Sequence, residues 1–165
     1  MLKPLLYLGA LLAVSSGIGS AQAKVRVEPS HLQGPRVLPE QTGTAAIRDY
    51  LQSWQSANAA LEQNRPDLLD PSFVGTARDK LTATIKQQAA LGVRTRYQDL
   101  SHDIQIVFYS PEGLSIELID KVALEIQVLD HDRVKTTQHI VARYVIVLTP
   151  AEVRWRVRVL QSAGD

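Results

Sequence analysis

One acidic residue lies where an alternating pattern predicts the core. Apolar residues alternate from Leu114 to Val128, and Asp120 shares their parity. Because successive side chains of a β-strand point to opposite faces, an unbroken strand directs the Asp120 carboxylate inward. Burial would raise the pKa of that carboxylate and suit it to act as a general base. The alternative is a bulge at residues 119–121, which would turn Asp120 out into solvent.

Two further polar side chains are expected beside this carboxylate. A tight turn at residues 130–133 places Tyr144 opposite Asp120, and a tight turn at residues 110–113 places His102 opposite it. An acid, an imidazole and a phenol at the mouth of one pocket suit proton transfer on a small apolar ligand. The candidate catalytic residues are therefore Asp120, His102 and Tyr144.

Several other side chains are inward by their period and are candidates to line a pocket. They are Tyr50, Trp54, Phe108, Gln138 and Trp155. Aromatic side chains serve equally well to fill a core and to line a ligand site. An enzyme requires the space beside Asp120 to be open, whereas an interaction protein can have it filled. The residue types leave both alternatives open.

A row of arginines marks the other face of the last two predicted strands. Arg154, Arg156 and Arg158 alternate along the final segment, and Arg143 is expected beside them. Such a row can bind a polyanion such as a cell-envelope polymer, or it can be a solvated sheet face that discourages aggregation. Together with the valines between residues 141 and 147, it could also form a homodimer or partner interface.

Composition excludes several classes of function. The chain has 18 Lys and Arg against 17 Asp and Glu, a net charge of +1, so no overall field attracts nucleic acid, and no nucleic-acid partner is expected. The absence of cysteine excludes disulfides, a thiolate nucleophile and a Cys-ligated zinc site. The four histidines have no metal-ligand spacing, so neither a metal nor a cofactor is predicted.

The N-terminus predicts export. Residues 1–23 have a basic start, a short apolar stretch and the sequence Ala-Gln-Ala, which together are typical of a secretory signal peptide cleaved after Ala23. We therefore expect a periplasmic or secreted protein, with membrane contact only if the segment stays uncleaved as an anchor. Residues 24–43 contain three prolines and predict a linker, or a strap lying on the domain.

Residues 44–162 predict one α+β domain. A helical stripe begins after a Thr44 N-cap and ends near Asn64, a short turn follows, and a second helix runs from Thr76 to Gly92. From Tyr97 onward the period is two, interrupted by three turns. Two or three N-terminal helices packed on a curved four-stranded antiparallel meander are expected.

This order resembles the nuclear-transport-factor-2-like cone. The resemblance rests on the Tyr50/Trp54 stripe, the corner at residues 68–73, the Gly92 break and a final hairpin containing Tyr144. Within that superfamily, the strand pattern is similar to the terminal domain of chloroplast and cyanobacterial division proteins, which is a binding module. The superfamily also includes isomerases, dehydratases and hydrolases, so the resemblance does not assign an activity.

The predicted function is a non-catalytic binding or protein-interaction module that uses the cone pocket, the outer sheet face or both. Its expected partners are a small apolar ligand, a cell-envelope protein or a second copy of the chain. One alternative is a small-molecule isomerase, dehydratase or hydrolase with Asp120 as general base. The other is polyanion binding through the arginine row.

Overall fold

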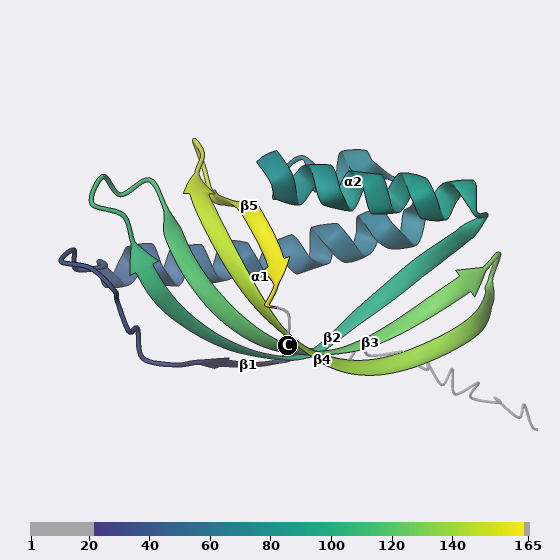
Figure 1. The fold of residues 1–165 in the computed structure, drawn as a ribbon, viewed down its shortest axis with the longest axis horizontal. Coiled ribbons are helices and arrows are strands. Elements are labelled where there is room, and N and C mark those ends of the chain that lie inside the picture. The colour runs from purple at the N-terminus through teal and green to yellow at the C-terminus, as the bar shows by residue number, and fades with distance from the viewer. Residues whose placement is uncertain (1–21, 164–165) are drawn as a thin grey trace, which may run out of the picture.

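A strongly curved sheet packs against two helices (Figure 1). The computed structural model describes residues 22–163, so the predicted signal segment lies almost wholly outside the described residues. No helix within the described range is long and apolar enough to cross a bilayer. In chain order the elements are β1 (Lys24–Val27), α1 (Glu40–Gln63), the 3-10 helix η1 (Pro66–Leu69), α2 (Gly75–Ala90), β2 (Val93–Tyr109), β3 (Ile116–Asp130), β4 (Arg133–Pro150) and β5 (Trp155–Ser162).

The first helix is longer than the sequence indicates. It begins at Glu40 after Pro39 rather than after Thr44, and Asn64 ends it in the left-handed conformation with φ 53°. Residues 40–43 are Glu, Gln, Thr and Gly, which add no large apolar residue to the stripe. Hydrophobic periodicity therefore does not indicate this first turn. Trp54 and Tyr50 lie on the buried face, as the helical spacing predicts. The second helix and the short turn before it also lie where they are expected.

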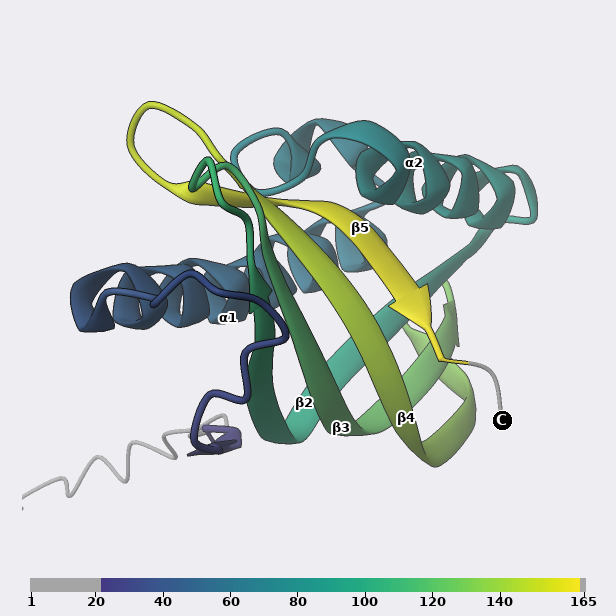
Figure 2. The same ribbon diagram turned by 60° about the vertical axis from the view of Figure 1, so that its left-hand side comes forward.

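The sheet has five strands and is mixed, so the prediction of four antiparallel strands is wrong in part. β2 to β5 form the expected antiparallel meander, in the order β1-β2-β3-β4-β5. β1 pairs in parallel with residues 101–104 of β2 at the edge of the sheet (Figure 2). Lys24 to Val27 is too short and too exposed to stand out as a strand.

The proline-rich segment after β1 is a strap attached to the domain rather than a free linker. The backbone N–H groups of Glu28 and His31 donate to the carbonyls of Ile104 and Ile106, at 2.8 and 3.0 Å. Farther along, the guanidinium of Arg36 donates to the carbonyl of Pro111 and lies 4.7 Å from the centre of the Tyr109 ring. Prolines remove a few donors, but the remaining amides of the segment still bond to the sheet.

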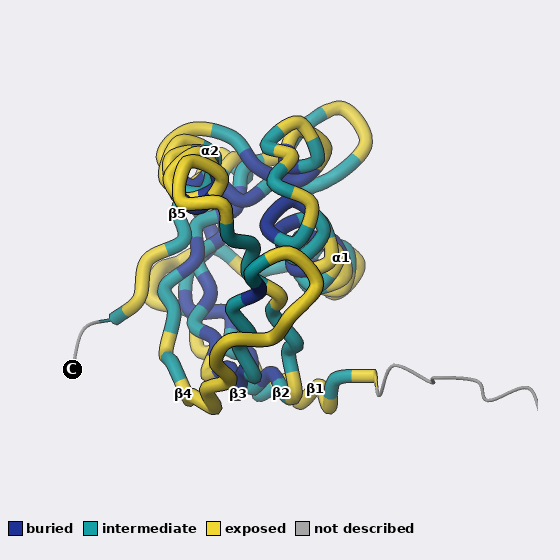
Figure 3. The backbone as a smooth tube through the Cα atoms, turned by 90° about the vertical axis from the view of Figure 1, so that its right-hand side faces the viewer, coloured by how far each residue is buried: buried dark blue, intermediate teal, exposed yellow. Residues whose placement is uncertain are grey.

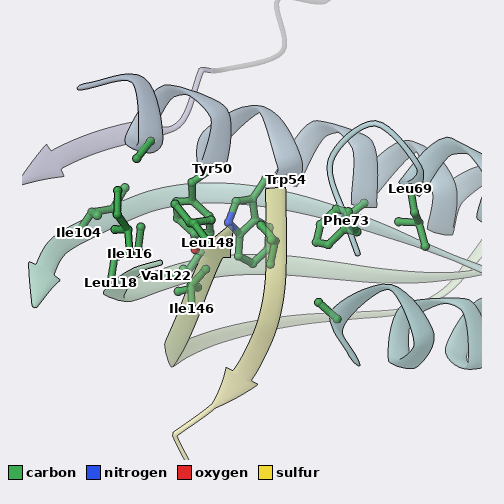
Figure 4. Packing of buried hydrophobic residues seen from close by; sticks show 14 of the residues in the cluster. Tyr50, Trp54, Leu69, Phe73, Ile104, Ile116, Leu118, Val122, Ile146 and Leu148 are labelled. Atoms are coloured by element: carbon green, nitrogen blue, oxygen red, sulfur yellow. The ribbon is translucent and has the colours of Figure 1, made fainter. Parts of the chain in front are cut away.

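The core lies between α1 and the concave face of the sheet (Figure 4). Burial alternates along β3 from Ile116 to Leu124, and Asp120 pairs with Tyr144 of β4, which confirms that predicted pairing. The β2–β3 register shifts twice instead, between Asp99 and Ser101 and between Ile106 and Phe108. These two irregularities decide the details of the candidate site.

One end of β4 is exposed. Every residue of β4 from Arg133 to Val141 is exposed, whereas Ile146 and Leu148 of the same strand are buried. In Figure 3 buried residues are dark blue and lie inside the fold, whereas exposed residues, which include this stretch of β4, are yellow. β5 pairs only with residues 144–150 of β4, so the opposite end of β4 extends beyond it.

Candidate functional site

Asp120 points into the core, as the parity argument predicts. Its side chain is 0% exposed, and three donors surround it. The Tyr50 hydroxyl donates to Oδ2 at 2.8 Å, His102 Nδ1 lies 2.6 Å from the same oxygen, and the backbone N–H of Asp103 donates to Oδ1 at 3.0 Å. A buried carboxylate is tolerated when it is paired and hydrogen-bonded in this way.

His102 reaches Asp120 from a diagonal position. The residue opposite Asp120 in β2 is Ile104, and His102 pairs with Val122 instead, so the predicted register is wrong by two residues. The loop before β3 is longer than predicted, because Phe108 pairs with Glu117 and not with Leu114, and the irregularity between Ile106 and Phe108 takes back one of these three residues. Diagonal neighbours across antiparallel strands remain within reach of a long side chain, so the predicted contact forms nonetheless.

A second carboxylate completes the cluster. His102 Nε2 lies 3.0 Å from Oδ2 of Asp99, whose other oxygen accepts a hydrogen bond of 3.3 Å from the amide of Asn58. Residues three apart in a regular strand point to opposite faces. The irregularity between Asp99 and Ser101 brings both side chains to one face, and no pattern of residue types in β2 indicates it.

The ionisable groups of this cluster shift one another's pKa values. Burial by itself lowers the pKa of His102, but its hydrogen bonds to Asp120 and Asp99 raise it to about 9. The hydrogen bond from His102 lowers the pKa of Asp99. Burial, followed by the nearby charge of Asp120, raises the pKa of Tyr50 well above its usual value. At neutral pH the imidazole is therefore a cation that donates through both nitrogens, one to each carboxylate.

An apolar cavity of about 190 Å³ lies beside the cluster, between α1, α2 and the sheet. It is lined mainly by aromatic and aliphatic side chains, with a few polar ones: Tyr50, Ser53, Trp54, Ala57, Asn58, Leu61, Phe73, Leu81, Thr84, Tyr97, Tyr144 and Leu160. Burial raises the pKa of both Tyr97 and Tyr144. Their hydroxyls are therefore neutral and can each donate one hydrogen bond at this cavity.

The side chains of Tyr50 and Trp54 separate the cavity from the charged cluster. Neither Asp120 nor His102 lines the cavity, and both are almost fully buried. Tyr50 contacts Asp120 from the cavity side. Trp54 packs edge-on against His102 and Tyr144, with 5.3 and 5.7 Å between the ring centres. A ligand in the cavity therefore meets phenol and indole groups, while the carboxylates stay behind them.

Several solved structures resemble this chain, although no protein-family profile and no curated protein matches it. The intermembrane space region of the chloroplast protein ARC6 aligns with a TM-score of 0.64 at 13% identity, over 79% of this chain and 100% of that one. A candidate scytalone dehydratase from Novosphingobium aromaticivorans aligns with a TM-score of 0.51 at 12% identity, over 76% and 89% of the two chains. A Mycobacterium tuberculosis protein of unknown function also aligns with a TM-score of 0.51, at 11% identity, over 79% and 78%.

The fold is nuclear-transport-factor-2-like. This confirms the resemblance that the helices, the corner and the final hairpin indicate. At identities of 11 to 13% the likeness concerns the fold alone. Neighbours with this fold include enzymes and proteins of unknown function, so the activity has to be argued from the site.

Within this nuclear-transport-factor-2-like fold, the predicted pocket residues separate into two groups. Tyr50 and Trp54 line the cavity, whereas Phe108, Gln138 and Trp155 do not. The irregularity after Ile106 reverses the parity of β2, so Tyr109 is buried and Phe108 faces the strap. Gln138 lies in the uncovered part of β4. Trp155 is half-buried at the start of β5, where its backbone N–H donates to Asp49 at 2.9 Å.

The predicted arginine row is not continuous. Arg156 pairs with Thr149 of β4, whereas Arg143 lies six positions farther along β4, roughly 20 Å away at the usual rise of a strand. Arg154 precedes β5 and is half-buried, and the stem of Arg158 lies against Gly75 at the start of α2. A register shift in the β4–β5 ladder separates Arg156 from the residues after Arg158. The four arginines therefore do not form one row of neighbouring positions, and polyanion binding stays a prediction from the sequence.

Metal ligation has no candidate in the described part of the chain. No group of three or more His, Asp or Glu side chains between residues 22 and 163 is placed to hold a metal ion. The imidazole of His102 already has a carboxylate on each nitrogen. The absence of a metal or cofactor therefore stays a prediction from the sequence.

Proposed function

We propose that this protein is a non-catalytic binding protein whose cavity takes a small, mainly apolar ligand. The observation that carries the proposal is the closure of the acidic cluster: Asp120 has three donors and no position on the cavity wall. A general base must come within hydrogen-bond distance of the proton that it removes. Tyr50 and Trp54 keep a ligand away from this carboxylate.

The cavity limits the ligand by size and polarity. A dry cavity of about 150 Å³ binds one benzene molecule, whereas drug-sized ligands need roughly 300 Å³ or more. A volume of about 190 Å³ therefore suits one or two rings or a branched aliphatic chain. The hydroxyls of Tyr97 and Tyr144 suit one carbonyl or hydroxyl group on it. If the predicted signal segment exports the chain, the ligand is met outside the cytoplasm.

The test uses 2-naphthol as the probe and calorimetric titration as the measurement. We expect binding by the natural chain and its loss in Thr84→Phe, because Thr84 lines the cavity from the exposed side of α2. The matched control is Ala83→Phe, which adds the same ring at the neighbouring exposed position outside the cavity wall. Equal binding by the two variants, or no binding by the natural chain, would contradict the proposal.

A second candidate is a small-molecule dehydratase or isomerase. One observation favours it: Tyr50 both lines the cavity and donates to Asp120, so a proton could pass between ligand and carboxylate through the phenol. One nuclear-transport-factor-2-like neighbour is a candidate scytalone dehydratase. The test is loss of water from a phenyl-substituted β-hydroxy ketone, followed by the absorbance of the conjugated enone. Turnover that disappears in both Tyr50→Phe and Asp120→Asn would replace the binding proposal by this one.

A further inference from the structure

The outer edge of β4 is a long unpaired strand edge. β5 pairs with β4 only from Tyr144 to Pro150, and one more bond joins the N–H of Ala163 to the carbonyl of Arg143. Beyond that point, no residue of the described chain pairs with the edge from Arg133 to Ala142. A free edge presents a row of unpaired N–H and C=O groups to any other extended chain.

The direction of these backbone groups follows from the last bond. The carbonyl of Arg143 points toward the β5 side. In an antiparallel strand, every second residue directs both its N–H and its C=O to the same side. Val141, His139 and Thr137 therefore direct theirs to the free edge. These three residues offer six hydrogen-bonding groups over a span that matches an ordinary strand of five to seven residues.

The edge is basic as well as unpaired. β4 contains Arg133, Lys135 and Arg143 and no acidic residue. Lys135 is paired with Asp130 at 3.3 Å, and His139 with Glu125 at 2.9 Å. Arg133 and Arg143, at the two ends of the free stretch, form no ion pair within the described residues. Val134, Ile140 and Val141 are exposed between these ends.

We propose that this free edge, Thr136–Ala142, binds an extended acidic segment of a partner protein as an additional β-strand. Backbone hydrogen bonds supply the affinity of such strand addition, and the side chains supply its specificity. Acidic residues of the segment complement Arg133 and Arg143, and apolar residues between them cover Ile140 and Val141. The interaction uses neither the cavity nor the cluster around Asp120.

Charge argues against a second copy of this chain as the occupant. In any register, pairing of two β4 edges sets a strand with three cations and no anion against itself. Like charges on directly opposite residues destabilise a strand pair. Basic residues on an edge are a known protection against self-association. The same charges that repel a second copy attract an acidic strand.

The experiment uses a blocked nine-residue peptide in which glutamate alternates with valine and threonine. The control peptide has lysine in place of every glutamate. We expect the glutamate peptide to bind about tenfold more tightly, an effect equivalent to one or two charge-assisted contacts. Hydrogen exchange measured by NMR should slow at the amides of Thr137, His139 and Val141. Equal binding of both peptides, or protection confined to other amides, would overturn the proposal.

Variants of the protein locate the contact. The double change Arg133→Gln and Arg143→Gln should weaken binding of the glutamate peptide about tenfold. The matched control is Arg26→Gln, which removes a cation from β1 at the other edge of the sheet. Thr84→Phe at the cavity should leave peptide binding unchanged. Equal losses in the edge and control variants would overturn the proposal.

The backbone contribution is tested without changing the protein. Methylation of alternate amide nitrogens in the glutamate peptide removes its donors while keeping its charge, and we expect binding to be lost. Unchanged binding would show a purely ionic contact and overturn strand addition. Sedimentation of the peptide-free chain at increasing concentration tests the other occupant. Self-association that protects the same three amides would assign the edge to a second copy instead.

Discussion

The two halves of the β3–β4 ladder differ in how far their inward side chains are covered, most of all on β4. In the covered half, the inward residues Leu118, Val122 and Ile146 are 0% exposed because α1 packs over them. In the uncovered half, Thr136 and Gln138 have the same inward parity but are exposed. Alternation therefore specifies which face a side chain takes, and the elements that pack on that face decide whether it is buried.

The difference is sharpest for two His–carboxylate pairs. His102 and Asp120 lie in the covered half, 2.6 Å apart and without solvent exposure. His139 and Glu125 lie in the uncovered half, 2.9 Å apart, with the imidazole 65% exposed. The pairs have similar geometry. Their energetic consequences differ, because only the buried pair has lost its hydration.

The largest expected effect comes from breaking the buried pair. Asp120→Asn should lower the free energy of unfolding by about 3–5 kcal/mol at neutral pH, since the His102 cation then lacks its closest counter-charge. Glu125→Gln removes the corresponding carboxylate in the uncovered half and should cost less than about 1 kcal/mol. Urea denaturation of both variants measures the difference. Comparable losses would show that the cluster around Asp120 is hydrated.

A pair of substitutions that shorten apolar side chains probes the boundary between the two halves. Leu124 and Ile140 are cross-strand partners, and they are 0% and 37% exposed. Leu124→Ala should cost about 2–5 kcal/mol, the usual range for a buried leucine. Ile140→Ala should cost less than half as much, because water already reaches that side chain. Thermal unfolding of both variants provides the measurement, and reversed ranks would contradict the assigned boundary.

The buried pair also predicts a pH dependence. The pKa of His102 is raised from 6.5 to about 9 in the folded state. Its contribution to stability is therefore fully present below pH 6.5 and is lost as pH rises through about 9. The loss should amount to a few kcal/mol. Denaturation between these pH values should show the slope in the natural chain and in His139→Gln, but not in His102→Gln.

The smallest effect concerns the strap that covers the opposite end of the sheet. Arg36→Ala removes the bond to the Pro111 carbonyl and the contact with the Tyr109 ring, and should cost about 1 kcal/mol. Arg133→Ala, at the uncovered end, should change stability by less than about 0.5 kcal/mol. Chemical denaturation resolves this difference if both variants are measured together. Equal values would indicate that the strap contact contributes nothing to stability.

Much of the fold follows from local patterns. The stripe of α1, its end at Asn64 and the four antiparallel strands are all indicated by periodicity and turn residues. The partnership of Asp120 with Tyr144 also follows, because Val128 pairs with Thr136 as expected and the ladder continues from there to Asp120 without a further shift. β1 could not be predicted with the same reasoning, since four exposed residues have no alternation of burial.

The site was only partly predictable. Tyr50 was expected at the pocket, but its hydrogen bond to Asp120 was not expected, because helix periodicity does not specify a contact across the core. Asp99 was missed altogether, and Phe108 was assigned to the wrong face. Both errors come from the two irregularities in β2, each of which reverses or shifts the alternation beyond it.

The sequence alone determines which side chains of β3 share a face, and therefore that Asp120 points inward. The reason is that side-chain direction along a strand is a local property of the backbone. Tertiary structure decided which groups meet that carboxylate and whether a ligand can reach it. Those outcomes depend on where β2 takes up an extra residue against β3 and on how far the helices extend over the sheet. Packing between distant segments determines both, and residue types within one segment do not record it.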